Sequence, residues 1–415
     1  MKPALPFVDL VAVGDNEARA GAITAVRGGL GGRGVGGIFD EAVDRRETDS
    51  VKWDRYRGTD IIPLWVADMD FRAPPAVLAA LTERVRHGVF GYGNASKALR
   101  ETILEHLARN HGLHVDSDAL VWLPGLVTGI NLACRAVGES GDEVLTATPV
   151  YPPFLSAPGL SGRGLRAVPL ARRPDGSYGW DWEAMERAVT PATRLLLFCN
   201  PHNPVGRVYD REELLRLAAF CVRHDLVLCA DEIHAGLILD PARTHVSIAG
   251  LAPDIAARTI TLLAPSKTFN LPGLGFSFAV IPDASLRTRF RAAMKGIVPD
   301  VNVLGYTAAL AAYRDGEAWR QELLAYLRGN RDRVVRALHG TALEVAPVEA
   351  TYLAWIDARA LGLGNPQRAF EKAGVGLSDG ADFGAPGFVR LNFGCPSGRL
   401  EEALARLRKA AQAAA

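Results

Sequence analysis

The sequence APSKTFNLPGLG occupies residues 264–275, directly after the apolar run Thr259–Leu263, and contains one lysine, Lys267. The apolar run predicts a buried β-strand. A lysine after such a strand is usually exposed, with its stem on apolar surface and its ammonium in water. The alternative is a desolvated lysine whose amine is a nucleophile near neutral pH and forms a Schiff base with a carbonyl group. The rest of the chain decides between these two interpretations.

Two other polar clusters also directly follow apolar runs. Asn200–Asn203 follows the run Arg194–Cys199, and Asp231–His234 follows Leu226–Ala230. Parallel strands end at the same edge of a sheet, and ligands of α/β proteins bind at that edge. We therefore expect both clusters to meet Lys267 in one site, and this coincidence favours the nucleophilic interpretation.

From residue 143 onward, apolar strands alternate with helical patterns, which predicts an α/β fold with a mostly parallel sheet covered by helices on both faces. Before this region, the apolar run Ile61–Val66 predicts a short strand. A helical stretch over about 305–340 should lead to a smaller domain with strands near 351–356 and 388–393. The expected parts are a flexible glycine-rich tail (1–37), an arm or small-domain segment (38–70), a large domain (71–300) and a C-terminal small domain (301–415). The glycines that end the tail also allow a phosphate-binding loop, but no strand precedes them.

Composition excludes several classes of function. The chain has 415 residues and a net charge of +1, so no nucleic-acid or acidic-membrane partner is expected. No apolar run of about 18 residues exists to span a membrane, and the first 30 residues do not resemble a signal peptide. The five cysteines are scattered without a CxxC pair, which predicts reduced thiols in a cytoplasmic protein and no metal site.

Several motifs together resemble a known family. APSKTFN, CNPHNPVGRV, ADEIH and VRLNFGCP are similar to motifs of fold-type I pyridoxal-phosphate enzymes of the aminotransferase superfamily. DRRETDSVKWDRY, IPLWVADMDFRAPPAV, HGVFGYG and TYLAWID resemble the C–S β-lyases of the cystathionine β-lyase (MalY/PatB) type. The likeness covers about residues 38–410. It implies an aspartate aminotransferase-like fold, with a mostly parallel seven-stranded sheet between helices in the large domain and a small α+β domain. It also implies pyridoxal 5′-phosphate as the cofactor.

The resemblance gives each polar cluster a role. Lys267 is expected to hold the cofactor aldehyde and, once freed, to remove the Cα proton of the substrate. Asp231 is expected to pair with the protonated pyridine nitrogen, Asn203 to donate to the ring's phenolate oxygen, and Tyr151 to stack on the ring. His234 stands where aminotransferases of this fold carry tyrosine, and it is expected to assist proton transfer. Taken alone, such an aspartate or asparagine would be interpreted as a cap or turn residue.

The phosphate group is expected to be bound by Ser266 and by the amides of Leu126 and Val127, which open a helix after a strand and a glycine turn. Tyr92 matches a tyrosine that reaches the phosphate from the neighbouring subunit in this fold. The resemblance therefore implies a homodimer with shared active sites.

The resemblance implies that Arg390 binds the substrate α-carboxylate, and an arginine inside an apolar strand is costly unless it is paired with an anion. The chain departs from the family at two positions. Gly275 stands where many aminotransferases carry a phosphate-binding arginine, and Gly236 replaces an aspartate common in the lyase subgroup. The second departure leaves the substrate preference open. His202 and Arg207 are interpreted as residues that shape their loop.

The resemblance predicts a C–S β-lyase that converts cystathionine-like or other S-substituted cysteines to a thiol, pyruvate and ammonia. Three alternatives remain open. The first is an aminotransferase, although His234 in place of tyrosine favours the lyase. The second is a specialised biosynthetic enzyme that acts on a larger cysteine thioether. The third is a regulatory protein that has kept the fold and lost turnover, which the presence of Lys267, Asp231 and Arg390 disfavours.

Overall fold

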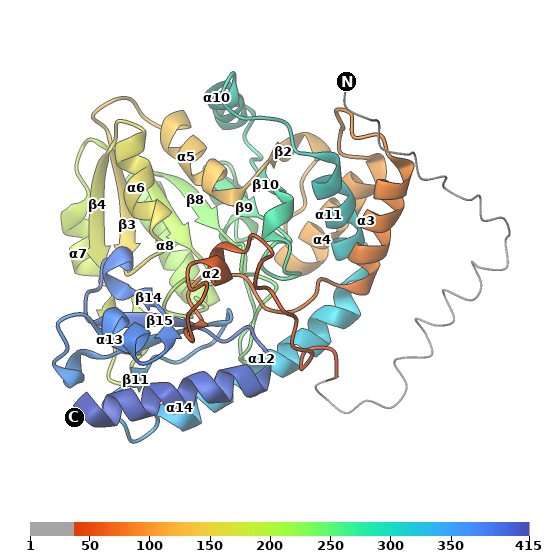
Figure 1. The fold of residues 1–415 in the computed structure, drawn as a ribbon. Helices are drawn as coiled ribbons and strands as arrows, with labels where there is room; N and C mark the ends of the chain where they lie inside the picture. Colours follow the sequence, from red (N-terminus) through yellow and green to blue (C-terminus); the bar gives the residue numbers. More distant parts are fainter. Residues whose placement is uncertain (1–36, 415) are drawn as a thin grey trace, which may run out of the picture. The chain divides into compact units, whose positions relative to one another are not determined.

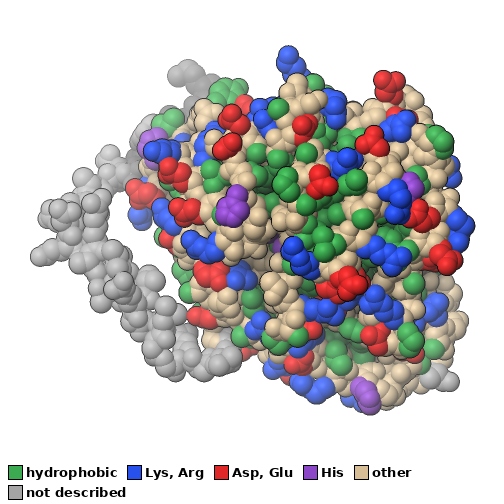
Figure 2. Space-filling view, turned by 180° about the vertical axis from the view of Figure 1, so that it is seen from behind, with side chains coloured by type: hydrophobic (Ala, Val, Ile, Leu, Met, Phe, Trp, Pro, Cys, Tyr) green, Lys and Arg blue, Asp and Glu red, His purple; other side chains and the backbone are tan. Residues whose placement is uncertain are grey.

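The computed structural model describes residues 37–414, so the glycine-rich tail expected over 1–37 lies almost entirely outside the described residues. Within the described part of the chain, no helix is both long enough and apolar enough to cross a membrane. On the face drawn in Figure 2, basic and acidic side chains are interspersed, with no broad area of one sign.

The larger sheet has seven strands and is mostly parallel, as predicted (Figure 1). The pairings from β9 to β4 are all parallel, whereas β10 is antiparallel to both of its neighbours. In spatial order the strands are β2 (Leu120–Leu123), β10 (Ser277–Val280), β9 (Thr259–Leu263), β8 (Val227–Asp231), β7 (Thr193–Cys199), β3 (Glu143–Thr148) and β4 (Gly164–Pro169).

Helices cover both faces of this sheet, because alternate side chains of a strand point to opposite faces. In β7, Leu195 and Leu197 belong to a core that they share with α5, α6 and α10. The intervening Leu196 and Phe198 belong to a second core with α7 and α8. These helices are α5 (Leu126–Ala136), α6 (Pro153–Leu160), α7 (Trp182–Ala188), α8 (Arg211–Arg223) and α10 (Ala284–Met294). The continuous apolar runs of the sequence are therefore strands buried on both sides.

A smaller antiparallel sheet follows in the C-terminal part of the chain. Its spatial order is β11 (Glu344–Val345), β12 (Leu353–Asp357), β15 (Phe388–Asn392) and β14 (Ser378–Asp379). Apolar residues of α12 (Glu317–Leu338), α13 (Pro366–Lys372) and α14 (Ser397–Ala414) share one core with β12 and β15. The long helical stretch expected over 305–340 is two helices, α11 (Val303–Asp315) and α12, separated at Gly316. Glycine is a poor helix former, which explains the break.

The segment before the large sheet contributes α2 (Val51–Asp54), α3 (Pro75–His87) and α4 (Lys97–His111). The strand expected over 61–66 is shorter: only β1 (Ile62–Pro63) pairs, in parallel with β13 (Val375–Gly376). Beyond Pro63, side chains rather than a neighbouring strand donate to the backbone carbonyls of residues 65–68. Short elements complete the fold: the hairpin β5 (Ala171–Arg172) and β6 (Tyr178–Gly179), and α9 (Pro253–Ala256).

Candidate active site

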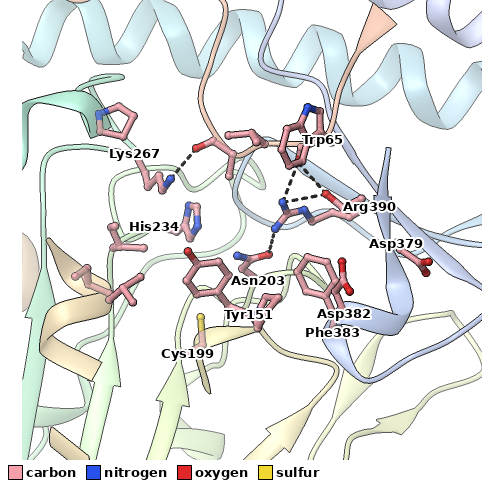
Figure 3. A pocket seen from close by; sticks show the side chains of 18 of the residues that line it. Trp65, Tyr151, Cys199, Asn203, His234, Lys267, Asp379, Asp382, Phe383 and Arg390 are labelled. Atoms are coloured by element: carbon pink, nitrogen blue, oxygen red, sulfur yellow. Dashed lines mark hydrogen bonds between the residues drawn. The ribbon is translucent and has the colours of Figure 1, made fainter. Parts of the chain in front are cut away.

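A cavity of about 660 Å³ lies at the carboxyl ends of β7, β8 and β9, where the sequence placed the site (Figure 3). Residues 65–67 and the smaller sheet close its other side. Nine of the ten predicted site residues line it: Leu126, Val127, Tyr151, Asn203, Asp231, His234, Ser266, Lys267 and Arg390. The tenth, Tyr92, does not line the cavity of its own chain, and its side chain is fully exposed.

Lys267 projects its amine into this cavity from the turn after β9. Its Nζ donates to the carbonyl oxygen of Ala67 at 2.7 Å. Burial lowers the pKa of Lys267 to about 8; Asp68 and Asp231 oppose this change, and the positive charge of Arg390 adds to it. A substantial fraction of the amine is therefore neutral near physiological pH, as a nucleophile or general base requires.

Asp231 ends β8 and is 3% exposed. Among the described residues, one group donates a hydrogen bond to its carboxylate: the backbone amide of Ile233, at 3.0 Å from Oδ1. Burial raises the pKa of Asp231 to about 7, although the amide of Ile233 and the charge of Lys267 act in the opposite direction. A buried carboxylate with so few donors is suited to pair with a cationic N–H group such as a protonated pyridine nitrogen.

The part of the cavity next to the first turn of α5 is suited to bind a phosphate. Helix α5 begins there, and no side chain caps its first turn. The N–H groups at such an end are free to bind an anion, and Leu126, Val127 and Ser266 line this part of the cavity. Gly275 lies nearby with φ 59°, a left-handed conformation that favours glycine, and a Cβ there would approach the oxygen of Pro124 at 3.2 Å. The backbone therefore accounts for the first departure from the family.

Arg390 lies in β15 with 5% of its surface exposed. Its guanidinium donates to Oδ1 of Asn203 at 2.9 Å and to the carbonyl oxygen of Trp65 at 3.0 Å, and it lies 4.7 Å above the ring of Phe383. No salt bridge to Arg390 forms among residues 37–414. Burial without an acidic partner lowers the pKa of Arg390 to about 10. A carboxylate ligand would neutralise this buried cation.

His234 and Tyr151 lie between the lysine and the arginine (Figure 3). The side chain of His234 is buried, and its Nδ1 atom has no partner among the described residues. Burial, together with the nearby charges of Lys267 and Arg390, lowers the pKa of His234 to about 3, so its imidazole is neutral in the working range. Burial raises the pKa of Tyr151, whose ring also faces the cavity.

Residues just outside the cavity shape it. His202 contacts the hydroxyl of Tyr209 at 3.0 Å and the oxygen of Pro149 at 2.9 Å, and Arg207 pairs with Glu349 at 2.9 Å. Both act on their loop, as the sequence suggested. A Cβ at Gly236 would meet the side chain of Thr268, which follows the lysine, and Gly236 does not line the cavity. Close packing therefore accounts for the second departure.

One group of described residues has ligand atoms close enough together for a metal ion, namely His111, Glu232 and His245. Hydrogen bonds already occupy the carboxylate of Glu232. Ser247 donates to its Oε1 at 2.8 Å, and Nε2 of His245 lies 2.9 Å from Oε2. Both contacts hold the residue next to Asp231 in place, so the cluster anchors the chain at the end of β8.

The sequence did not reveal several contributors to the cavity. The carbonyl groups of Trp65 and Ala67 bind Arg390 and Lys267, but backbone atoms leave no trace in residue identity. Ser378 and Phe383 also contact Arg390. The outer wall carries charges of both signs and was not anticipated either; these residues are Arg55, Arg368, Glu371, Asp379 and Asp382.

The fold and the site together define a class of protein. The chain belongs to the aminotransferase class I and II family, whose model matches residues 59–407. The family and the fold predicted from the motifs are therefore confirmed.

Particular relatives are also similar to this chain. Cystathionine β-lyase PatB of Bacillus subtilis (strain 168) is 38% identical over 385 residues, which cover 90% of this chain and 99% of PatB. The solved structure of OvoB is 48% identical with a TM-score of 0.88, covering 90% of this chain and 98% of OvoB. That of cystalysin from Treponema denticola, which contains a pyridoxal 5′-phosphate cofactor, is 31% identical with a TM-score of 0.86, covering 90% and 98% of the two chains.

Proposed function

We propose that this protein is a pyridoxal-phosphate-dependent C–S β-lyase that cleaves cystathionine-like or other S-substituted cysteines to a thiol, pyruvate and ammonia. One observation carries the proposal. A single cavity contains an amine with a lowered pKa, a buried acid short of donors and a buried arginine without a counter-ion. The relatives named cystathionine β-lyase support the same reaction.

The residues of the cavity fit the cofactor at each of its functional groups. Lys267 would hold the aldehyde and Asp231 the pyridine nitrogen, while Asn203 would donate to the ring oxygen and Tyr151 would stack on the ring. Ser266 and the amides of Leu126 and Val127 would bind the phosphate. When bound, pyridoxal phosphate supplies an electron-accepting ring that stabilises negative charge at the substrate's Cα.

The protein's own groups account for the remaining requirements of an elimination. Arg390 binds the α-carboxylate and orients the substrate, because its cation has no acidic partner among the described residues. The neutral amine of Lys267 removes the Cα proton, and the C–S bond breaks with its electron pair on sulfur. The ammonium that Lys267 becomes on taking the Cα proton is the proton source for the departing thiolate, and neutral His234, which lines the same cavity, is placed to relay that proton. Hydrolysis of the unsaturated product in water gives pyruvate and ammonia.

A homodimer is part of the proposal. Tyr92 is fully exposed, and Val89 and Phe90 beside it are also exposed, an arrangement that suits a surface covered by a second copy. The tyrosine would then reach the phosphate in the partner's cavity. We further propose a cytoplasmic location, which the five buried, unpaired cysteines support. We also propose that the parts of the chain begin at residues 38, 71 and 301.

The direct test is release of thiol and pyruvate from an S-alkyl cysteine in the absence of any keto acid. A lyase releases both in equal amounts. The rival aminotransferase would instead transfer the amino group to an added keto acid and liberate no thiol. A visible absorbance band that is present in the native protein and lost in Lys267→Ala would establish the covalent attachment of the cofactor. Comparison of S-methylcysteine with cystathionine would show whether the charged outer wall selects a longer thioether.

A further inference from the structure

The carbonyl oxygen of Ala67 accepts two hydrogen bonds, and one donor comes from outside the cavity. Nζ of Lys267 lies 2.7 Å from this oxygen, and the hydroxyl of Tyr352 lies 2.8 Å from it. Tyr352 is 1% exposed and is not among the described residues that line the cavity. Its hydroxyl reaches the lysine's hydrogen-bond acceptor at Ala67, and the edge of its ring packs against His234, with the ring centroids 6.2 Å apart.

The backbone holds Tyr352 in this place at some cost. The residue before it, Thr351, has φ 74°, a left-handed conformation that is rare for a β-branched residue. Bonds on both sides hold the strained residue: the amide of Thr351 donates to the oxygen of Leu237 at 2.9 Å, and the amide of Phe393 donates to the oxygen of Tyr352 at 2.9 Å. The surrounding hydrogen bonds therefore hold the backbone at Thr351 and Tyr352 in one conformation despite the strain.

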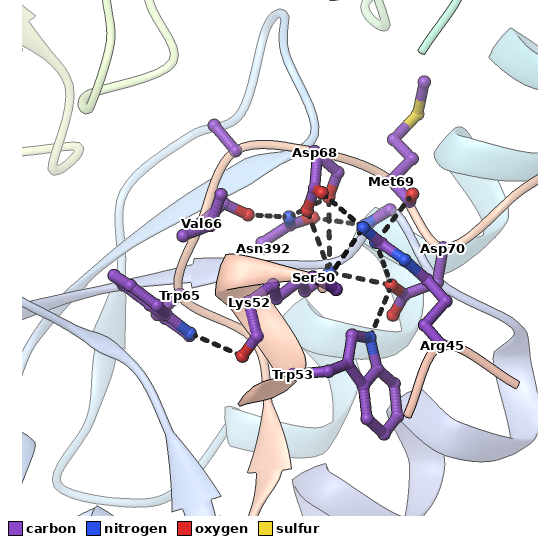
Figure 4. Close-up of polar contacts among 12 residues, drawn as sticks. Arg45, Ser50, Lys52, Trp53, Trp65, Val66, Asp68, Met69, Asp70 and Asn392 are labelled. Atoms are coloured by element: carbon purple, nitrogen blue, oxygen red, sulfur yellow. Dashed lines mark hydrogen bonds and ion pairs between the residues drawn. The ribbon is translucent and has the colours of Figure 1, made fainter. Parts of the chain in front are cut away.

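The peptide groups on either side of the Ala67 carbonyl are also held in place (Figure 4). Asn392, which is fully buried, donates to the carbonyl oxygens on either side of Ala67, at 2.5 Å to Val66 and 2.7 Å to Asp68. The buried ammonium of Lys52 also donates to the oxygen of Asp68, at 3.2 Å. With both neighbouring peptides anchored, the carbonyl of Ala67 cannot rotate away from the cavity, so it is a fixed acceptor rather than a mobile loop atom.

We propose that the Ala67 carbonyl binds the Lys267 amine whenever that amine is free of the cofactor. The Tyr352 hydroxyl occupies one lone pair of the same oxygen, and Tyr352 is thereby a positioning residue for the lysine. The part that concerns turnover rests on the proposed lyase function, whereas the docking of the amine does not. Tyr352 leaves the second lone pair of the oxygen pointing at Lys267, since a carbonyl oxygen has two.

Because Tyr352 and Lys267 share the Ala67 oxygen, Tyr352 also affects how strongly this oxygen binds the protonated amine of Lys267. A hydrogen bond from an ammonium is stronger than one from a neutral donor, so an acceptor already engaged by a hydroxyl stabilises the ammonium less than a free one does. The other groups that face Lys267 are Asp68, Asp231, Arg390 and the neutral His234. Removing only the hydroxyl of Tyr352 leaves these side chains in place; the hydroxyl also helps to raise the pKa of Arg390, but with a pKa of about 10 the arginine stays charged around pH 8.

The test uses Tyr352→Phe, which removes the hydroxyl and keeps the ring. The full-length protein is stripped of cofactor, and labelling of Lys267 by a small amine reagent is followed by peptide mass mapping over a pH range around 8. We expect the labelling midpoint to move to higher pH by about half a unit, because Lys267 gains sole use of the acceptor. In the loaded enzyme, the acid limb of the kcat profile should move in the same direction while KM stays constant, since Arg390 is untouched.

Tyr313→Phe is the control, because Tyr313 is partly buried and its hydroxyl forms no hydrogen bond with residues 37–414, and the labelling midpoint of this variant should equal that of the native protein. Site-specific 3-fluorotyrosine at position 352 keeps the fold and strengthens the donor, so it should move the midpoint to lower pH; it also decides the matter should Tyr352→Phe not fold. An unchanged midpoint in either variant, or a change opposite to that expected, overturns the proposal. Altered labelling without lyase activity would refute only the proposed reaction, whereas lyase activity with unaltered labelling would refute only the docking point.

Discussion

Replacing Asp231 by asparagine is expected to stabilise the cofactor-free protein at alkaline pH while it abolishes cofactor chemistry. Asp231 is 3% exposed, and within residues 37–414 its carboxylate accepts one hydrogen bond, from the amide of Ile233. Asparagine has nearly the same shape and no charge. The substitution therefore removes the cost of keeping an ionised carboxylate away from water.

The magnitude follows from the pKa of Asp231, which burial raises from 3.8 to about 7. Each pH unit corresponds to about 1.4 kcal/mol, so ionised Asp231 weakens the folded state by at most about 4 kcal/mol. Because the folded-state pKa is the higher one, this loss begins as the pH rises above about 4 and is complete above about 7. Below that range Asp231 is protonated in both states, and the native protein and the variant should be equally stable.

Calorimetric melting of the cofactor-free proteins checks this prediction. At pH values above 7, Asp231→Asn should melt a few degrees above the native protein, whereas near the acid end the two should coincide. Asp116→Asn, at an exposed position, should show no such pH-dependent gain. Added pyridoxal phosphate should raise the melting temperature of the native protein more than that of the variant. A variant that is no more stable than the native protein above pH 7 would refute the argument that ionised Asp231, buried without a cationic partner, destabilises the cofactor-free protein.

Three further outcomes are expected. Arg390→Gln should lower kcat/KM for thioether cleavage by at least about 30-fold, mainly through KM, because loss of a buried charge pair typically costs 2 kcal/mol or more; steady-state kinetics will show whether kcat falls instead. The rate of thiol release should increase with pH, and the midpoint of this increase should lie near pH 8, since the neutral amine of Lys267 is the base. A rate that decreases across this range would contradict that role. Finally, Tyr92→Ala and Lys267→Ala should each be inactive alone but regain about a quarter of native activity when their subunits are exchanged, whereas an inactive mixture would exclude shared sites.

Much of the site could be predicted from sequence because its polar residues follow apolar strands. Thr259–Leu263, for example, is a strand with the bounds expected, and Lys267 follows it into the cavity. The same reasoning was correct for Asp231 and Asn203, since parallel strands deliver whatever follows them to one edge. It was wrong about the length of the strand near residue 62, because pairing there depends on partners far away in the chain.

The sequence by itself determined the order of strands and helices, the family, and which polar side chains meet in one cavity, because these depend on residue identity and local spacing. Only the tertiary structure decided how those side chains are tuned. The lowered pKa of Lys267 and the raised pKa of Asp231 arise from burial, and the amine is held by a backbone carbonyl at Ala67, about 200 residues away along the chain. Desolvation and backbone acceptors belong to the packed molecule, so no pattern of residue types reveals them in advance.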